Sequence, residues 1–167
     1  SLQITQNTIF QVLWSILLQR YNNTDDSLFG IVVSGRPPEI EAVDQMVGLF
    51  INTIPLRVTT DPNETLSQLL RRTHRQSAEM NRYQHLPLAE IQTNHPLKNQ
   101  LIRHLFVFEN YPLEKELDQL SVQRDGFAVT ILPGNEQTHY DLIVAVSPGS
   151  SVHIKFTYNA NLYDGDY

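Results

Sequence analysis

Residues 29–58 constrain the fold most strongly, because they read as a strand, a polar loop and a second strand. The first strand is predicted at residues 28–33, an apolar run rich in β-branched side chains. It ends at Ser34-Gly35-Arg36-Pro37-Pro38, where glycine permits positive φ and the prolines remove backbone donors. A second apolar run, residues 47–58, contains one amide, Asn52. Because an amide in an apolar strand needs hydrogen-bond partners or a wet cavity, Asn52 marks a candidate site.

The next signals are helical. Residues 7–21 are predicted to form a helix whose apolar face consists of Ile9, Val12, Leu13, Ile16 and Leu17, widened by Phe10, Trp14 and Leu18. A second helix should start at Thr65, because Thr65 and Gln68 have the spacing of a capping box. Its outer face carries Arg71, Arg72 and Arg75. A short helix is expected at residues 88–92, directly after Pro87.

The second half of the chain is predicted to be mostly strand. The expected strands are residues 105–108, 128–132, 142–146 and 152–158. Residues 142–146 are apolar on both faces and should form a covered strand, whereas residues 152–158 alternate and should be half-exposed. Pro148-Gly149-Ser150 is a turn that makes these two strands a hairpin. The whole pattern predicts an α/β sandwich, a mixed sheet with helices packed on it.

Composition excludes several classes of function. The 167 residues correspond to one domain, residues 1–167, and the net charge of −6 argues against binding to nucleic acid or anionic membranes. The absence of cysteine excludes disulfides and thiolate metal sites, and it is compatible with the cytoplasm. No apolar run approaches the roughly 20 residues of a membrane span. Charged residues make up 18%, below the average of about 25%, which indicates that part of the surface is covered in use.

Several polar residues are candidates for a catalytic or binding role. Ser34 with His139 and Asp141 could form a nucleophilic triad, but Ser-Gly-Arg-Pro does not resemble a nucleophile elbow, so a turn-capping serine is favoured. The six histidines lack the spacing of a helical metal site, and no metal is expected. Arg36 is interpreted either as a charge partner or as an ion pair within its loop, with Glu39 or Glu41. The cluster Arg71, Arg72 and Arg75 either binds an acidic partner or forms a solvated helix face.

The motifs resemble the condensation domains of nonribosomal peptide synthetases, specifically the opening of the C-terminal half of that domain. The segments that carry the resemblance are, in chain order, residues 29–30 (FG), 34–37 (SGRP), 47–53 (VGLFINT), 55–57 (PLR), 83–88 (YQHLPL), 95–97 (HPL), 107–112 (VFENYP), 140–142 (YDL) and 156–159 (FTYN). The first block is the most specific, and the others gain weight from their order. The resemblance implies a chloramphenicol-acetyltransferase-like fold.

The family's catalytic signature, His-His-x-x-x-Asp-Gly, does not occur in this chain. The resemblance therefore implies a C-terminal subdomain that lacks the N-terminal catalytic half and a final helix, and no catalytic residue is assigned. It implies that Ser34, Gly35, Arg36 and Asn52 form a wall of the substrate tunnel. It also implies that Arg71, Arg72 and Arg75 contact a carrier domain.

The activity implied is the joining of aminoacyl or peptidyl thioesters carried on phosphopantetheine arms, with no cofactor bound by this chain. The implied partners are the other half of the domain, peptidyl carrier domains and an adjacent adenylation domain, all in the cytoplasm. The isolated chain is expected to be inactive and to dimerise. Three alternatives stay open: half of an epimerisation domain, a carrier-binding module without catalysis, and a complete small acyltransferase.

Overall fold

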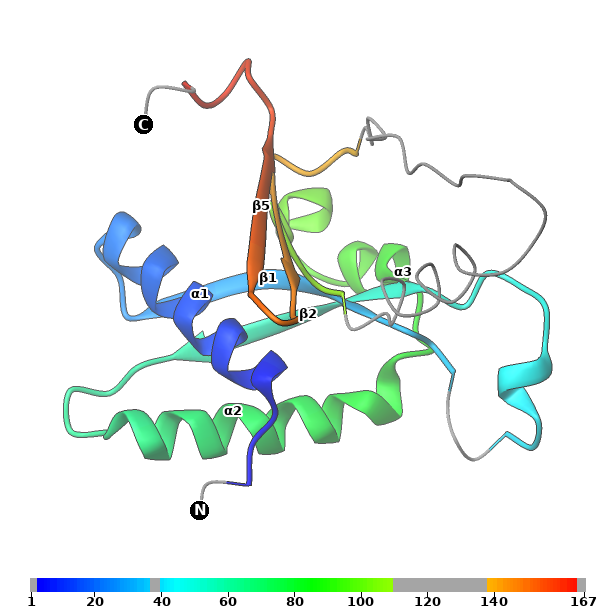
Figure 1. Cartoon of the computed structure of the whole chain (residues 1–167). Helices are drawn as coiled ribbons and strands as arrows, with labels where there is room; N and C mark the ends of the chain where they lie inside the picture. The colour runs from blue at the N-terminus through cyan, green and yellow to red at the C-terminus, as the bar shows by residue number, and fades with distance from the viewer. Residues whose placement is uncertain (1–2, 37–39, 110–137, 165–167) are drawn as a thin grey trace, which may run out of the picture.

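A computed structural model describes residues 3–36, 40–109 and 138–164. The elements within these ranges are α1 (Gln6–Asn22), β1 (Asp26–Val33), η1 (Val43–Gln45), β2 (Asn52–Thr59), α2 (Leu66–Met80), η2 (Asn81–Tyr83), α3 (Leu88–Thr93), η3 (Lys98–Gln100), β3 (His104–Phe108), β4 (Leu142–Ser147) and β5 (His153–Tyr158). None of these helices is long and apolar enough to cross a bilayer. Figure 1 shows α1 and α2 packed beside the sheet, which confirms the predicted mixed sheet with packed helices.

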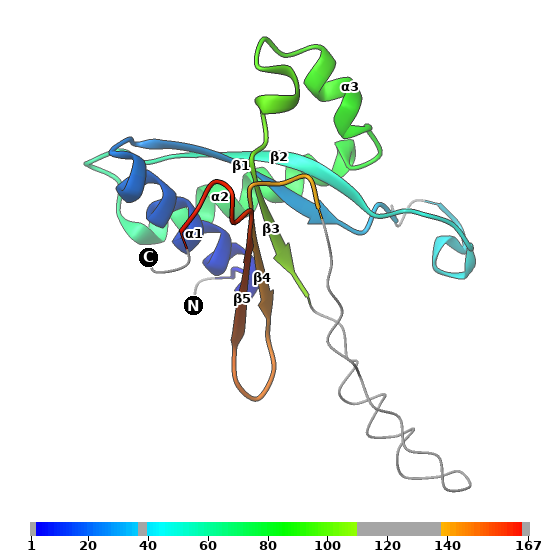
Figure 2. The same ribbon diagram turned by 90° about the horizontal axis from the view of Figure 1, so that it is seen from above.

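The five strands form one mixed sheet in the order β2-β1-β3-β4-β5. The β1–β2 and β4–β5 pairs are antiparallel, whereas β3 runs parallel to both β1 and β4. The predicted hairpin of residues 142–158 is therefore confirmed. The sheet is not evenly paired, because β1 and β3 share only two registered positions while β3 and β4 share five. Figure 2 shows the result: β3, β4 and β5 lie along one axis, and the β1–β2 hairpin lies at a large angle to it.

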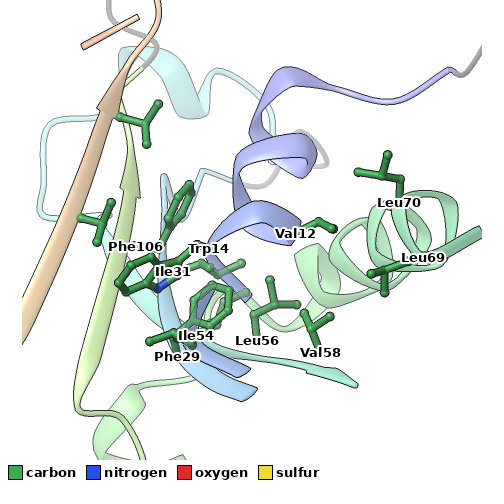
Figure 3. Close-up of a cluster of buried hydrophobic side chains, with 13 residues drawn as sticks. Val12, Trp14, Phe29, Ile31, Ile54, Leu56, Val58, Leu69, Leu70 and Phe106 are labelled. Carbon is green, nitrogen blue, oxygen red and sulfur yellow. The ribbon is translucent and has the colours of Figure 1, made fainter. Parts of the chain in front are cut away.

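The hydrophobic core lies between the sheet and the helices α1 and α2. Its fully buried side chains include Val12 of α1, Phe29 of β1 and Leu56 of β2, all with no exposed surface. Figure 3 shows these side chains converging with Leu69 and Leu70 of α2 and with Phe106 of β3. On the other side of the β1–β2 hairpin lies the α3 segment (Figure 2). One strand pair is thus covered from both sides, which fixes the position of its ends.

The predicted apolar face of the first helix is wrong in part. Ile9, Leu13 and Leu17 are 37%, 51% and 42% exposed, and polar residues occupy the inner side instead. The polar side chains of α1 form hydrogen bonds with neighbouring elements. Thr8 pairs with His74 and Ser15 with Ser27, Gln11 Oε1 accepts from the Ser77 hydroxyl, and Gln19 Nε2 donates to the Val58 carbonyl. Because these four polar side chains are paired, they avoid the cost of an unpaired buried group, whereas Asn7 Oδ1 and Trp14 Nε1 of the same helix have no hydrogen-bond partner among the described residues.

Three strand predictions need correction or lie outside the description. The second strand starts at Asn52 rather than at residue 47, and Val47 and Leu49 are 103% and 92% exposed. Strand β5 is exposed on both faces, because Ile154 and Phe156, which were expected on the covered face, are 49% and 53% exposed. The expected strand at residues 128–132 lies outside the described residues. Apolar composition alone does not distinguish a run of residues buried in the chain from a run exposed on its surface. This explains the errors in the start of β2 and in the exposure of β5.

Candidate functional site

One edge of the sheet gathers most of the residues predicted for the site. Because β1, β3 and β4 are parallel, their carboxyl ends point to the same edge. Ser34 follows β1 there, and Asn52 begins β2 opposite Val33. Glu109 and Ser147 stand at the ends of β3 and β4. Ligand sites in open α/β sheets commonly lie beyond the carboxyl ends of the strands, which makes this edge the candidate site.

Gly35 makes the sharp corner that brings the loop back over the end of β1. Its φ is +62°, and a Cβ added there would lie 1.8 Å from the carbonyl oxygen of Phe50. Positive φ is strained for a residue with a side chain, and a contact that short with backbone cannot be relieved by a rotamer change. Only glycine fits this corner, so the sequence prediction of a flexible-φ position here is explained by a specific close approach.

Arg36 organises the loop of residues 40–51 through backbone carbonyl groups, and the described Glu41 forms no ion pair with it. Its guanidinium donates hydrogen bonds to the carbonyl oxygens of Val43 and, at 3.1 Å, Met46. The same group lies 4.2 Å from the ring centroid of Phe50, a cation–π contact. Of the two acidic partners considered, Glu39 lies outside the described residues. The loop is thus held from three directions by one side chain.

Asn52 connects β2 to the segment between α2 and α3. Its Nδ2 donates to the carbonyl oxygens of Gln84, at 2.8 Å, and Leu86, at 2.6 Å. Both amide hydrogens are therefore used structurally, while no described residue bonds Oδ1. The donor side of this amide therefore has a structural role, and a role of Asn52 in a binding site stays a prediction.

The arginines of α2 differ in their surroundings. Arg72 donates hydrogen bonds to the carboxylate of Glu64, at 2.8–2.9 Å, and to the Thr59 carbonyl. The bonds to the carboxylate hold the pKa of Glu64 below its ordinary value. Arg71 and Arg75 are exposed. Arg72, whose side chain is 41% exposed, also fastens α2 to the end of β2, and a contact of the three arginines with another domain stays a prediction.

The triad considered for Ser34 does not assemble. Gly30 is level with Leu105 and Leu105 with Ile143, so Ser34 and His139 lie about eight residues apart along the strands. At about 3.3 Å per residue they are separated by roughly 26 Å, on opposite edges of the sheet. Within the described ranges, no three histidine or acidic side chains gather as metal ligands.

Two hollows among the described residues lie away from the candidate edge. One of about 870 Å³ lies between the end of α1 and the β2–α2 connection, with Asn23, Asp61 and Leu66 among its lining residues. Another of about 330 Å³ is lined by Arg103, His139 and Asp141, among others. Arg103 and Asp141 pair with each other at 2.6 Å. Neither hollow brings together free groups suited to a reaction, so the polar edge is the better candidate.

His104 provides a test of this structure by pH. Its ring packs 6.3 Å from that of Trp14 and its Nε2 lies 3.2 Å from the Tyr163 hydroxyl. Burial, and secondarily the charge of Arg103, lowers the pKa of His104 below its ordinary 6.5, while Asp141 opposes the shift. The unfolded chain therefore binds a proton more readily than the folded chain. This contribution to stability should be complete above pH 6.5 and decline as the pH falls below it.

Urea unfolding of the wild type and of His104→Gln at pH 7.5 and 5.5 measures the effect. Glutamine retains a group that can bond Tyr163 but does not titrate. The variant should lose less stability than the wild type between these pH values. Asp26 and Glu64 do not interfere with this comparison. Hydrogen bonds from Arg57 and Arg72 lower the pKa values of these two carboxyl groups, so their effect on stability appears at a lower pH than the two compared. Equal loss in both proteins would contradict the assignment to His104.

Comparison with known sequences identifies a family. The family model described as the condensation domain matches residues 1–166. Tyrocidine synthase 2 of Brevibacillus parabrevis is 47% identical over 163 residues, which cover 97% of this chain and 4% of that protein. Gramicidin S synthase 2 of Brevibacillus brevis is 43% identical over 166 residues, covering 99% and 4%. The chain therefore spans a small fraction of these synthetases.

Solved structures agree on the fold. A four-domain nonribosomal peptide synthetase bound to AMP and glycine matches with a TM-score of 0.76 at 18% identity, over 98% of this chain and 14% of that one. The starter condensation domain of rhizomide synthetase, solved with C8-CoA, matches with a TM-score of 0.70 at 19% identity, over 96% and 36%. The chloramphenicol-acetyltransferase-like fold expected from the sequence is confirmed.

Proposed function

The chain belongs to the condensation-domain family, and from this premise we propose that it forms part of a peptide-bond-forming unit of a nonribosomal peptide synthetase. The observation that carries the proposal is the match of the condensation-domain model to residues 1–166. Identities of 43–47% to two antibiotic synthetases support it. The reaction would join two aminoacyl or peptidyl groups that are held as thioesters on phosphopantetheine arms of carrier domains.

We assign residues 1–167 to the C-terminal subdomain of that unit. The chain spans 36% of the rhizomide condensation-domain chain, which supports a partial domain. The remainder of the unit would supply the catalytic histidines and a final helix. Its further partners would be carrier domains and an adjacent adenylation domain in the cytoplasm. Exposed Arg71 and Arg75 would meet an acidic carrier, with Arg72 supporting the helix on which they lie.

In this proposal Ser34, Gly35, Arg36 and Asn52 form one wall of the substrate tunnel, and we call them the wall residues. Gly35 sets the corner, Arg36 holds the loop, and Asn52 offers its free Oδ1 to an N–H group of the substrate arm. None of them is a proton acceptor suited to the amine. The contribution of this wall is orientation of two bound groups, an effect that can lower a barrier by several kcal/mol.

The proposal predicts that the isolated chain does not condense aminoacyl thioesters, because it holds no residue assigned as a base. The same residues within the whole condensation domain should form a dipeptidyl thioester from loaded donor and acceptor carriers. Mass spectrometry of the carrier-bound product measures both reactions. Product from the isolated chain above the uncatalysed rate would indicate a complete small acyltransferase. Inversion of one residue without amide formation by the whole domain would indicate epimerisation.

A second prediction concerns surface that a partial domain leaves open. Leu13 and Leu17 of α1 and Phe156 of β5 are 51%, 42% and 53% exposed, and exposed apolar surface and unpaired strand edges promote association. The isolated chain should therefore associate at micromolar concentration, and added salt should not dissociate it. Sedimentation velocity over a concentration series tests this. Leu13→Glu should weaken association more than the matched change Leu66→Glu on α2, and a monomer at every concentration would contradict the prediction.

A further inference from the structure

A carboxylate and a hydroxyl at the candidate edge are not among the wall residues. The Glu109 backbone N–H donates to the Val146 carbonyl at 2.8 Å, and the Ser147 hydroxyl donates to Glu109 Oε2 at 2.7 Å. Among the described residues, the three ion pairs involve Asp26, Glu64 and Asp141, so Glu109 has no cationic partner there. Glu109 is exposed, its Oε2 is oriented by the Ser147 hydroxyl, and none of the residues that the structure describes bonds its other carboxylate oxygen.

The sheet opens beside this carboxylate. Strands β1 and β3 are registered only at Gly30 with Leu105 and at Ile31 with Phe106. Had the ladder continued, Ser34 would stand opposite Glu109. Instead the strands diverge toward the candidate edge, as Figure 2 shows. Glu109 and the wall residue Ser34 therefore stand on the two sides of the opening, with no β1–β3 ladder between them.

The chemistry of the proposed reaction leaves one charged group to be recognised. The acceptor carries a free amine, and α-amines have ordinary pKa values of about 7.7–8.0, so much of it is cationic at neutral pH. Hydrogen bonds between an ammonium group and a carboxylate are stronger than those between neutral groups. An exposed hydrogen bond such as the one between Glu109 and Ser147 contributes little to stability. Stability alone therefore gives no reason for a carboxylate at this edge.

We propose that Glu109 binds the acceptor amine and that Ser147 is the positioning residue that orients this carboxylate. The inference rests on the proposed function. Before attack the bound ammonium gives one proton to water and becomes the free amine. Its nitrogen then forms the new C–N bond as the thioester C–S bond breaks, and the sulfur leaves as a thiol that carries the second proton given up by the nitrogen. Glu109 holds N–H groups of the amine before attack and is not the final proton acceptor, so no further reactant is required.

The test measures binding rather than turnover, in the whole condensation domain. The probe is an acceptor carrier whose phosphopantetheine bears the amino acid through a stable amide, compared with the same carrier bearing the acid without its amine. Calorimetry should show that the amine strengthens binding about tenfold to a hundredfold in the wild type and in the matched control Glu90→Gln. In Glu109→Gln the difference should fall to about twofold or less. Ser147→Ala should reduce it in part, and Ser147→Thr should restore it.

The outcomes separate the two proposals. A preference for the amine that persists at full strength in Glu109→Gln overturns the assignment of Glu109, whether or not the domain is active. Loss of that preference in Glu109→Gln, with partial loss in Ser147→Ala and none in Glu90→Gln, supports it. A whole domain that makes no dipeptidyl thioester from loaded carriers refutes the proposed function, and the binding comparison still decides what Glu109 recognises.

Discussion

Replacing Asn52 by leucine should lower the free energy of unfolding of the chain by about 1–3 kcal/mol, the usual cost of leaving buried polar groups unpaired. The change removes both hydrogen bonds from Nδ2, to the carbonyl oxygens of Gln84 and Leu86. Gln84 is only 8% exposed, so water cannot readily replace the bond to its carbonyl. For a domain of this size, a loss of 1 kcal/mol corresponds to about 2–4 °C in Tm.

Thermal unfolding and hydrogen exchange measure the effect of Asn52→Leu. Exchange should accelerate in residues 83–88, which Asn52 fastens to β2. Asn99→Leu is the matched control, since that exposed side chain makes no hydrogen bond with the described residues. In the whole condensation domain, turnover per folded molecule should fall as well, because Oδ1 is removed from the wall. A stability loss with normal turnover would assign Asn52 a purely structural role, and unchanged stability would show that its hydrogen bonds are dispensable.

The fold was predictable where the local signal and the tertiary environment agree. The capping box at Thr65 and Gln68 is present with both of its hydrogen bonds, because its partners lie within one turn of helix. The β4–β5 hairpin formed as expected around its Pro-Gly turn. Predictions of burial failed where they depended on distant residues. The inner face of α1 is polar because His74, Ser77 and the Val58 carbonyl supply partners that α1 itself cannot indicate.

The candidate site was predictable in part for the same reason. Its glycine corner and unusual amide are visible as local departures from an apolar pattern. The pairing of Glu109 with Ser147 joins residues 38 apart in the chain, and only the parallel β3–β4 ladder brings them together. The bonds from Asn52 to Gln84 and Leu86 likewise cross 32 and 34 residues. The signal that could have found Glu109 is its place at the end of an apolar strand, where a carboxylate is unusual.

Gly35→Ala should have the largest effect on the loop. Alanine can retain neither the φ of +62° without strain nor the approach to the Phe50 carbonyl, because its Cβ would lie 1.8 Å from that oxygen. A Gly-to-Ala change at positive φ destabilises by more than about 1 kcal/mol even without a clash. The corner should therefore move away from Phe50 and take Arg36 with it. The loop of residues 40–51 would then lose the contacts through which Arg36 holds it.

In the whole condensation domain, this displacement should reduce turnover on the order of a hundredfold, the loss expected when a positioning group moves by about 1 Å. Hydrogen exchange should accelerate in residues 40–51 while the core strands β1 and β3 remain protected. Gly48→Ala is the matched control in the same loop, because its Cβ would meet only the Phe50 ring edge, at 3.1 Å, which a small ring movement relieves. Faster exchange of the loop with unchanged turnover would separate the loop from the reaction, and the wall would then have to be sought elsewhere along this edge.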